Sequence, residues 1–547
     1  MSNSVNEILG SDLLFVIGSN TTEAHPIIGN KMKQAVLKGT KLIVVDPRQT
    51  ELARMADLHL PLESGSDAAL INGMMHIILH EGWEAKEYIA ERTSGFEELA
   101  ETVERYTPDI VSEITGISEE DLYEAARMYA QTAKAGIYYT LGITEHTTGT
   151  SNVMNLANLA LITGHVGYEN AGINPLRGQN NVQGACDMGA LPNTYPGYQR
   201  VENERAIKFF SDFYGTAMNP KEGLRIPEMM DAAVEGKLHA IYVMGEDPVL
   251  SDPDANHVKK AMSSLDFLVV QEIFMSETAK YADVVLPASC YAEKDGTFTA
   301  SERRVQRVRQ AVNPPGEARL DWQIICQLAQ KMGAPGFDFR DAEEIFEEIR
   351  ATTPSYRGMT YQRLEQENGL QWPCPTESHP GTKYLHKGVF PGGKARMIPV
   401  EYEGPAELTN EEYPILLSTG RKLGHYNVTT RYSRLLDSIN PYEEAEINPQ
   451  EAEKHGLAAG DLIRVSSRRG SVVTRIEITD KVKPGMMFMT FHYRETPVNE
   501  LTQAAYDPIT LTGEYKVSAV RIEKVEWQDA DLADEVRRFA RLDQLIK

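Results

Sequence analysis

The sequence predicts an α/β protein with two parallel-sheet α/β domains followed by a C-terminal β-barrel. Short apolar runs alternate with helical patterns between residues 13 and 287, and this alternation occurs twice. Strands that alternate with helices in this way are typical of parallel sheets. Residues 414–525 instead contain closely spaced β-rich runs separated by glycine turns, which indicate a compact barrel.

The two α/β copies form a weak internal repeat. Each copy has a strand, a glycine turn, a helix, a second strand with an acidic end, and the motif Ala-Asp-x-x-Leu-Pro. In the first copy these parts are 13–17, Gly18-Ser19-Asn20, 27–39, 41–45, Asp46-Pro47-Arg48 and 56–61. In the second copy they are 240–244, 245–248, 257–264, 267–270, Gln271-Glu272 and 282–287.

Each copy predicts a ligand site at the carboxyl end of its strands. Glycine turns and helix N-termini can face phosphates there, and an acid after the second strand can bind a ribose hydroxyl or a base edge. Neither copy has a complete Gly-x-Gly-x-x-Gly sequence, so two plain βαβ layers are the alternative interpretation. Two incomplete sites fit two guanine nucleotides better than one NAD, and an NAD-dependent dehydrogenase is therefore the weakest interpretation.

The remaining sequence predicts helices at 85–170, helices broken by loops at 296–385, and an amphipathic helix at 529–547 that caps the fold. A linker rich in proline and glutamate near 401–413 precedes the barrel. We expect four domains: an α/β half-site domain with the Arg177 loop (1–180), a second α/β half-site domain (181–295), a helical and loop domain (296–405) and the barrel domain (406–547).

Composition excludes several function classes. A net charge of −24 argues against nucleic acid or an anionic membrane as the main partner. No apolar run is long enough for a spanning helix, and the first residues do not resemble a signal peptide, so we expect a cytoplasmic protein. The four cysteines contain no Cys-x-x-Cys pair, a spacing that cannot by itself hold an iron–sulfur cluster or a structural zinc, and we assign no metal ligand.

The most informative segment is 174–199, which has neither a helical nor a strand period. It carries Arg177 among glycines and amides such as Gln179. Glycines let the backbone approach a ligand, amides offer donors and acceptors, and one guanidinium can hold a small carboxylate by two parallel hydrogen bonds. The alternative is a long surface loop with an ordinary solvated arginine.

The first barrel strand ends in a second polar cluster. Ser418-Thr419-Gly420-Arg421 is followed by Gly424-His425-Tyr426-Asn427. Hydroxyls, a glycine turn, a guanidinium and an imidazole within ten residues could bind phosphate or a pterin. A strand-end turn with solvated polar residues is the alternative.

The run at 174–199, the two half-sites and the barrel together resemble the catalytic subunits of formate dehydrogenases in the molybdopterin oxidoreductase superfamily. The resemblance extends from Val5 to about Val525. It implies a double-psi-like barrel and oxidation of formate to carbon dioxide, or the reverse, in anaerobic metabolism. The cofactor implied is molybdenum or tungsten bound by two molybdopterin guanine dinucleotides, with Arg177 orienting formate as the catalytic residue.

The resemblance also assigns binding residues. It implies contacts to one dinucleotide at Gly18, Ser19, Asn20, Asp46, Arg48, Gly65 and Asp67. The second set is Gly245, Glu246, Asp247, Gln271, Glu272 and Thr278. Gln179 is placed next to the pterin. Barrel contacts are Ser418, Thr419, Gly420, Arg421, His425, Tyr426, His492, Asn499, Tyr515 and Lys516.

The sequence departs from the family at its beginning. Complete members start with a cysteine-rich segment for a 4Fe-4S cluster, followed by a cysteine or selenocysteine that binds the metal. Neither is present here, so we expect a chain truncated at its amino terminus, which a selenocysteine codon read as a stop would explain. The isolated chain is then expected to be inactive.

Three interpretations compete with a formate dehydrogenase: a non-catalytic scaffold or assembly subunit of the same fold, a nitrate reductase, and the NAD-dependent dehydrogenase. The absence of the cysteine or selenocysteine that binds the metal favours a scaffold, whereas Arg177 and the two half-sites favour the enzyme. Expected partners are formate or carbon dioxide and electron-transfer subunits, which could be iron–sulfur, NAD-linked or deazaflavin-linked proteins or a hydrogenase.

Overall fold

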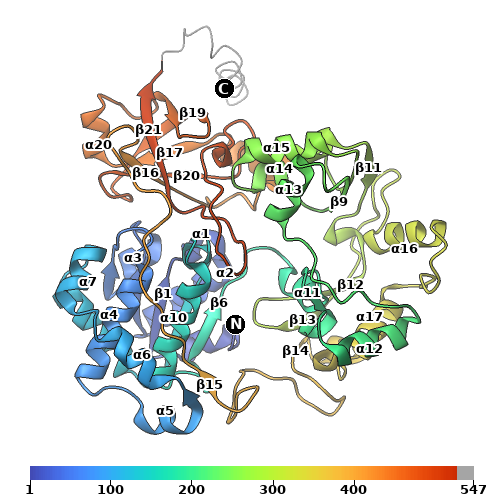
Figure 1. The fold of residues 1–547 in the computed structure, drawn as a ribbon, viewed down its shortest axis with the longest axis horizontal. Coiled ribbons are helices and arrows are strands. Elements are labelled where there is room, and N and C mark those ends of the chain that lie inside the picture. The colour runs from blue at the N-terminus through green and yellow to red at the C-terminus, as the bar shows by residue number, and fades with distance from the viewer. Residues whose placement is uncertain (526–547) are drawn as a thin grey trace. The chain divides into compact units, whose positions relative to one another are not determined.

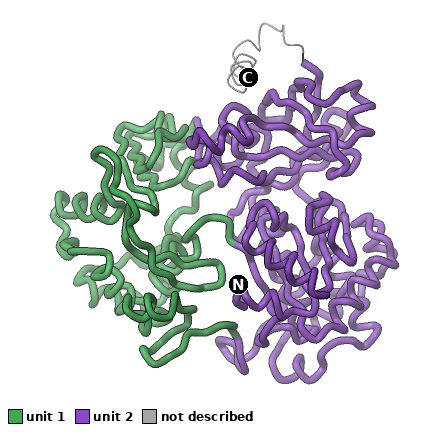
Figure 2. Tube along the Cα trace, turned by 180° about the vertical axis from the view of Figure 1, so that it is seen from behind, with its two compact units in different colours: residues 1, 177–247, 260–385 green, residues 2–176, 248–259, 386–547 purple. Residues whose placement is uncertain are grey.

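The computed structural model describes residues 1–525, so the helix expected at 529–547 lies outside the described residues. The chain divides into two compact units (Figure 2). Unit 1 comprises residues 1, 177–247 and 260–385, and unit 2 comprises residues 2–176, 248–259 and 386–547. We describe each unit by itself.

Unit 2 begins with a five-stranded parallel sheet in the order β3-β2-β1-β5-β6. Figure 1 labels its strands β1 and β6. The strands are β1 (Leu13–Ile17), β2 (Lys41–Val45), β3 (Leu58–Leu60), β5 (Ala135–Tyr139) and β6 (Gly172–Pro175). All residues of β1 and β5 are buried, which explains their continuous apolar sequences. The chain leaves β1 toward β2 and β3 and returns on the other side at β5. Open α/β sheets bind ligands at the carboxyl ends of the strands where the order reverses, and in this sheet those strands are β1 and β5.

Some helices of this part pack directly on the strands of the sheet, and others pack on those helices. The described helices of this part are α1 (Thr21–Ala24), α2 (Pro26–Leu37), α3 (Glu51–Met55), α4 (Asp67–His80), α5 (Lys86–Arg92), α6 (Phe96–Val103), α7 (Pro108–Thr115), α8 (Glu119–Ala130), α9 (Leu141–Thr144) and α10 (Gly149–Ile162). Local sequence sets their ends: Ser118 caps α8 through the backbone N–H of Asp121, and Gly116 ends α7 with φ of 71°. Helix α4 has few polar positions, because α7, α8 and α10 all pack on it.

The barrel of unit 2 is closed and has six strands in the order β16-β20-β17-β19-β18-β21, which confirms the expected barrel. The strands are β16 (Ile415–Gly420), β17 (Glu444–Ile447), β18 (Leu462–Ser466), β19 (Ser471–Ile478), β20 (Met486–Thr490) and β21 (Ser518–Lys524). Strand β16 runs parallel to β20 and antiparallel to β21, so the barrel mixes both directions. Short helices α19 (Arg434–Ile439) and α20 (Pro449–Lys454) connect its strands.

Unit 1 contains the second parallel sheet, in the order β11-β10-β9. Its strands are β9 (Ala240–Met244), β10 (Phe267–Glu272) and β11 (Val284–Pro287). The two α/β copies share hydrogen bonds as well as sequence. Asp57 accepts from the backbone N–H of Leu42 at 2.9 Å, and Asp283 accepts from that of Leu268 at 2.7 Å. The Ala-Asp-x-x-Leu-Pro motif therefore ties the third strand of each copy to the start of the second.

The segment 296–385 of unit 1 differs from the helices and loops that the sequence predicts, because it also holds a three-stranded antiparallel sheet. Its strands are β12 (Gly296–Thr299), β13 (Arg304–Val308) and β14 (Leu370–Gln371). The charged segment 301–303 is the turn between the first two. Each strand is too short to show a clear alternation. The longer helices of unit 1 are α12 (Glu204–Tyr214), α13 (Ile226–Val234), α16 (Asp321–Lys331) and α17 (Ala342–Thr352), and the shorter ones are α11 (Val182–Asp187) and α18 (Tyr361–Gln366).

Two further helices, α14 (Pro248–Ser251) and α15 (Ala255–Ser264), follow β9. Within residues 1–525, no helix combines the length and the apolar character needed to cross a membrane.

Candidate functional site

The first group of expected binding residues lies at the carboxyl edge of the five-stranded sheet. Gly18 follows β1 with φ of 56°, and a Cβ on it would lie 2.7 Å from the carbonyl carbon of Gly142. The carbonyl oxygen of Gly18 accepts from Thr140 Oγ1 at 2.7 Å and from the N–H of Gly142 at 3.1 Å. The chain segments after β1 and β5 thus touch where the sheet order reverses, and this contact requires glycine.

Two carboxylates lie at the same edge, of which Asp67 is buried and Asp46 is partly buried. Asp46 follows β2, and Asp67 is the first residue of α4. Burial raises the pKa of Asp67 from its usual 3.8 to about 6, against the opposing charge of His146. Burial also raises the pKa of Asp46, although Arg48 opposes this shift. Carboxylates whose ionisation is made unfavourable by desolvation are typical of functional sites, where a ligand can supply the missing hydrogen-bond donors.

We expect Asp67→Asn to stabilise the protein increasingly as the pH rises. The raised pKa means that the folded protein must ionise a buried carboxyl above about pH 6, whereas the unfolded chain ionises it near 3.8. The stability that the Asp67 carboxyl contributes to the wild type is therefore lost as the pH rises from 3.8 to about 6. The advantage of the variant in free energy of unfolding should grow by about 2 kcal/mol between pH 4 and pH 8. Denaturant titrations across this range measure it, and a pH-independent difference would contradict the buried ionisation.

Unit 2 brings this edge of the sheet together with residues of the barrel. Lys516 donates to the carbonyl oxygen of Thr419 at 2.9 Å and pairs with Glu145 at 2.7 Å. Arg48 pairs with Glu446 of β17 at 2.6 Å. Nε of Arg48 is buried and has no hydrogen-bond acceptor among the described residues. Such a donor is expected to have a ligand as its acceptor. The other expected binding residues of the first sheet are Ser19, Asn20 and Gly65. Those of the barrel in this part are Ser418, Gly420 and Arg421, at the end of β16.

His492 supports the loop after β16. Its Nδ1 donates to the carbonyl oxygen of Asn427 at 2.6 Å, and its Nε2 accepts from the N–H of Lys422 at 3.1 Å. Burial lowers the pKa of His492 to about 3, so the ring is neutral. His425 likewise binds the carbonyl oxygen of Asn440 at 2.7 Å, while Tyr426 beside it is exposed. Both rings therefore fix the segment that presents Arg421.

Asn499 and Tyr515 have a similar supporting position. Nδ2 of Asn499 donates to the carbonyl oxygens of Leu250 and Ser251 at 2.7 and 3.0 Å. The hydroxyl of Tyr515 donates to the carbonyl oxygen of Ser251 at 3.1 Å. Together they satisfy the end of α14, whose last carbonyl groups have no partners within so short a helix.

The second group of expected binding residues lies at the carboxyl edge of the sheet in unit 1. Gly245 follows β9 with φ of 64°, and its N–H donates to the carbonyl oxygen of Gln271 at 2.9 Å, as Gly18 does toward Val45 in the first copy. Asp247 accepts from the N–H and the hydroxyl of Thr278 at 2.8 and 2.6 Å. The structure therefore pairs Asp247 with Thr278, which the sequence separates by 31 positions.

The acids of this second edge are also costly to ionise. Partial desolvation of its carboxyl, followed by the charge of Asp247, raises the pKa of Glu246, although the residue as a whole is exposed. Burial also raises the pKa of Glu272 at the end of β10. Gln271 is fully buried and donates to Asp321 Oδ1 at 2.8 Å.

Contacts within the Arg177 loop, together with one to Ser301, hold Arg177 in place. Arg177 Nε donates to Gln183 Oε1 at 3.0 Å, and Nη1 lies 3.6 Å from Cys186 Sγ. The backbone N–H of Arg177 donates to Ser301 Oγ at 3.2 Å. Gln179 is exposed. This guanidinium is therefore held from one side by defined partners, unlike an ordinary solvated arginine.

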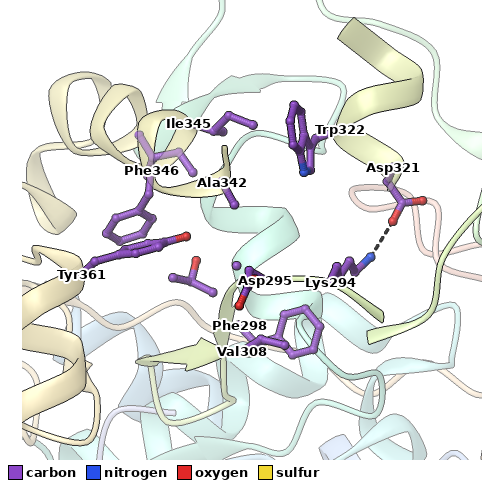
Figure 3. Close-up of a pocket in the computed structure, with 13 residues that line it drawn as sticks. Lys294, Asp295, Phe298, Val308, Asp321, Trp322, Ala342, Ile345, Phe346 and Tyr361 are labelled. Atoms are coloured by element: carbon purple, nitrogen blue, oxygen red, sulfur yellow. Dashed lines mark hydrogen bonds and ion pairs between the residues drawn. The ribbon is translucent and has the colours of Figure 1, made fainter. Parts of the chain in front are cut away.

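A cavity of about 220 Å³ lies elsewhere in unit 1 (Figure 3). Aromatic side chains line it, and the pair formed by Lys294 and Asp321 lies at one end, with Nζ and Oδ2 2.5 Å apart. None of the expected site residues is among its lining residues. In unit 2, His76, His80 and Glu104 could share a metal ion, but His80 and Glu104 are exposed and already bonded to each other at 3.2 Å.

Comparison with known families matches residues 1–331 to the family described as molybdopterin oxidoreductase and residues 415–519 to the molydopterin dinucleotide binding domain. The chain belongs to the molybdopterin oxidoreductase family. The first match includes both glycine turns and the Arg177 loop, and the second includes most of the barrel.

Relatives in this family include several formate dehydrogenases. The chain is 49% identical to the F420-dependent formate dehydrogenase subunit alpha of Methanocaldococcus jannaschii, over 96% of this chain and 78% of that protein. It is 41% identical to formate dehydrogenase H of Escherichia coli, over 97% and 75%. The assimilatory nitrate reductase catalytic subunit of Bacillus subtilis is 37% identical, over 95% and 76%.

A solved structure supports the family fold. Acetylene hydratase from Pelobacter acetylenicus superimposes with a TM-score of 0.76, covering 96% of this chain and 81% of that chain. At 22% identity this similarity concerns the fold alone. The residues of this molybdopterin oxidoreductase fit a dinucleotide cofactor on structural grounds: two glycine turns of the same geometry, buried carboxylates beside each, and the buried Nε of Arg48 without an acceptor among the described residues.

The sequence did not single out several residues that complete these groups. Glu145 pairs with Lys516, and His146 lies 3.4 Å from the buried Glu514. Asp187 and Gln183 lie in the informative run itself, but the importance of Asp187 depends on Tyr356 and Trp372, which lie far along the chain. The available signal for Asp187 was that it is the single acid in the run 174–199, which also carries Arg177.

Proposed function

We propose that this chain oxidises formate to carbon dioxide at a molybdenum or tungsten centre held by two molybdopterin guanine dinucleotides. The observation that carries the proposal is the guanidinium of Arg177, fixed through Nε by Gln183 within an amide-rich loop. A guanidinium held in this way suits a small carboxylate. The formate dehydrogenase relatives, which span nearly the whole chain, support the same substrate.

Two groups of residues would hold the cofactor. The residues at the carboxyl edge of the first sheet, together with those of the barrel, suit one dinucleotide, and Asp247, Gln271 and Thr278 with their neighbours suit the other. The N–H groups that follow Gly18 and Gly245 suit phosphates, because those of the two glycines already donate to the carbonyl oxygens of Val45 and Gln271. Lys516, Arg48 and Arg421 supply positive charge for the first dinucleotide. When bound, the metal centre accepts the two electrons that leave formate.

Arg177 has two tasks in this reaction. It binds the formate oxygens by parallel N–H bonds, which fixes the direction of the C–H bond and makes the reaction effectively unimolecular. Formate then loses two electrons and one proton and becomes carbon dioxide. Because carbon dioxide carries no charge, the guanidinium attracts the product less than the substrate and so favours its release.

We further propose that the electrons pass through an iron–sulfur cluster to a partner subunit. The relatives named as subunits alpha support a multi-subunit enzyme. The acceptor is linked to NAD, to a deazaflavin or to a hydrogenase, three partner classes that the chain's own residues do not distinguish.

The test is to produce the protein from its complete gene, together with its partner proteins, in a host that makes the cofactor. We expect about two guanosine nucleotides per chain after cofactor hydrolysis, bound molybdenum or tungsten, and formate-dependent reduction of viologen. Reduction of nitrate without formate oxidation would replace the proposal by a nitrate reductase. A folded chain that purifies with its partners but without metal or nucleotide would instead support the scaffold interpretation.

A further inference from the structure

The Arg177 loop contains a buried carboxylate with an unusual number of donors. Asp187 is 1% exposed. Its Oδ1 accepts from Gln183 Nε2 and from the hydroxyl of Tyr198, both at 2.8 Å. Its Oδ2 accepts from the hydroxyl of Tyr356 at 2.5 Å and from Trp372 Nε1 at 2.8 Å. Four neutral donors from three parts of unit 1 therefore converge on one acid.

These bonds determine which way the amide of Gln183 points. An ionised carboxylate only accepts hydrogen bonds and a guanidinium only donates them. Gln183 lies between Asp187 and Arg177, so its Nε2 must face the acid and its Oε1 must face the guanidinium. The two measured bonds, 2.8 Å to Asp187 and 3.0 Å from Arg177 Nε, agree with this orientation.

Fixing Gln183 also fixes the rotation of the guanidinium. Once Nε donates to Gln183, the planar group can turn little about its side chain, and its terminal nitrogens keep one direction. Two anchors limit it further, namely the Sγ of Cys186 at 3.6 Å from Nη1 and the hydroxyl of Ser301 on the backbone N–H of Arg177. A formate that binds the terminal nitrogens inherits this direction.

We infer that Asp187 is a positioning residue that orients Arg177 toward formate through Gln183. This inference rests on the proposed function, because formate is the ligand whose orientation is at issue. Asp187 touches neither formate nor Arg177 in this scheme. It acts by holding one amide in the single orientation that gives the arginine an acceptor.

An exchange of the two polar groups tests the inference. In Asp187→Asn the introduced amide and Gln183 compete for the same orientation, and in Gln183→Glu two carboxylates face each other. The double variant, which combines Asp187→Asn with Gln183→Glu, again places one amide opposite one carboxylate. Its net charge equals that of the wild type.

The double variant gives each group a complementary partner. The introduced carboxylate at position 183 accepts from Arg177 Nε and from the introduced amide nitrogen at position 187. The amide oxygen at position 187 still accepts from Tyr356 and Trp372. The hydroxyl of Tyr198, which lies 3.0 Å from Gln183 Nε2 in the wild type, can donate to the introduced carboxylate. The exchange therefore reverses the polarity of one contact and preserves the rest of the network.

We expect each single variant to raise the KM for formate by about tenfold or more. In Asp187→Asn the amide of Gln183 loses its fixed orientation, and in Gln183→Glu repulsion from Asp187 displaces the introduced carboxylate from Arg177. The double variant should return the KM to within about threefold of the wild type. All variants should keep the metal and nucleotide content of the wild-type complex. Singles with an unchanged KM, or a double variant as impaired as the singles, would overturn the inference.

Tyr356→Phe is the matched control for a purely structural role. It removes one donor from Asp187 Oδ2 but leaves the contact with Gln183 in place. We expect it to lower the melting temperature and to change the KM for formate by less than about threefold. An increase in KM as large as that of Asp187→Asn would show that Asp187 acts only through folding and would refute the positioning role.

Two further measurements keep the inference testable. Should Asp187→Asn not fold, Gln183→Met decides, because it removes the acceptor of Arg177 while Asp187 keeps three donors; an unchanged KM for formate then refutes the inference. Should the wild type not oxidise formate, the proposed function fails. The N–H resonance of Arg177 Nε still reports the network, shifting in the single variants and returning in the double variant.

Discussion

Arg177→Lys is expected to lower kcat/KM for formate by about 100-fold in the cofactor-loaded complex. Lysine keeps the positive charge but loses the planar pair of N–H groups that binds two carboxylate oxygens. It also cannot reach Gln183 in the geometry of Nε, which donates at 3.0 Å. Steady-state formate oxidation with viologen measures this change.

The control for this prediction is the metal and guanosine nucleotide content of the variant. Arg177 lies in the loop of unit 1 and not among the residues of the two nucleotide groups, so the variant should keep its metal and its guanosine nucleotides. A variant that loses the metal would place Arg177 in cofactor binding instead of substrate binding. Arg225→Lys is a matched substitution, because Arg225 pairs with Glu222 outside both the loop and the nucleotide groups, and it should leave kcat/KM unchanged.

Gly18→Ala is expected to destabilise unit 2 by about 3 kcal/mol. The new Cβ would lie 2.7 Å from the carbonyl carbon of Gly142, and the residue must also keep φ of 56°. The backbone cannot move aside here, because the carbonyl oxygen of Gly18 is bonded to both Thr140 and Gly142. Denaturant unfolding of the full chain measures the loss, and guanosine nucleotide content should fall with it.

Gly82→Ala separates the steric clash of the added Cβ from the cost of the positive φ. Gly82 has φ of 70°, but nothing lies within 4 Å of its added Cβ. It should lose only the backbone contribution of about 1 kcal/mol. If both variants lose the same stability, the close approach between the turns after β1 and β5 contributes nothing, and the explanation for Gly18 is wrong.

Much of the fold could be predicted from the sequence because it depends on local patterns. Strands β1, β2 and β9 have the bounds that their apolar runs predict, and the repeat between the two α/β copies extends to equivalent hydrogen bonds of Asp57 and Asp283. The closed barrel also follows from its closely spaced strands. The antiparallel sheet within 296–385 could not be predicted, because strands this short carry no clear alternation and are defined by their partners.

The expected binding residues divide in the same way. Glycine turns and the acids after the strands could be predicted, since a parallel sheet places the carboxyl ends of its strands at one edge. The roles of individual side chains could not. His492 carries the polarity of a ligand contact in the sequence, whereas in the fold both its ring nitrogens bind backbone groups of the neighbouring loop.

The resemblance of the sequence to a known family predicted the family, and residue types at short spacing predicted the two glycine turns at the sheet edges. The contacts that hold Arg177 are a property of the tertiary structure. Asp187 receives donors from Tyr356 and Trp372, which follow it by 169 and 185 positions. Such contacts arise when distant segments pack together and bury an acid that must then find donors. No local pattern specifies them.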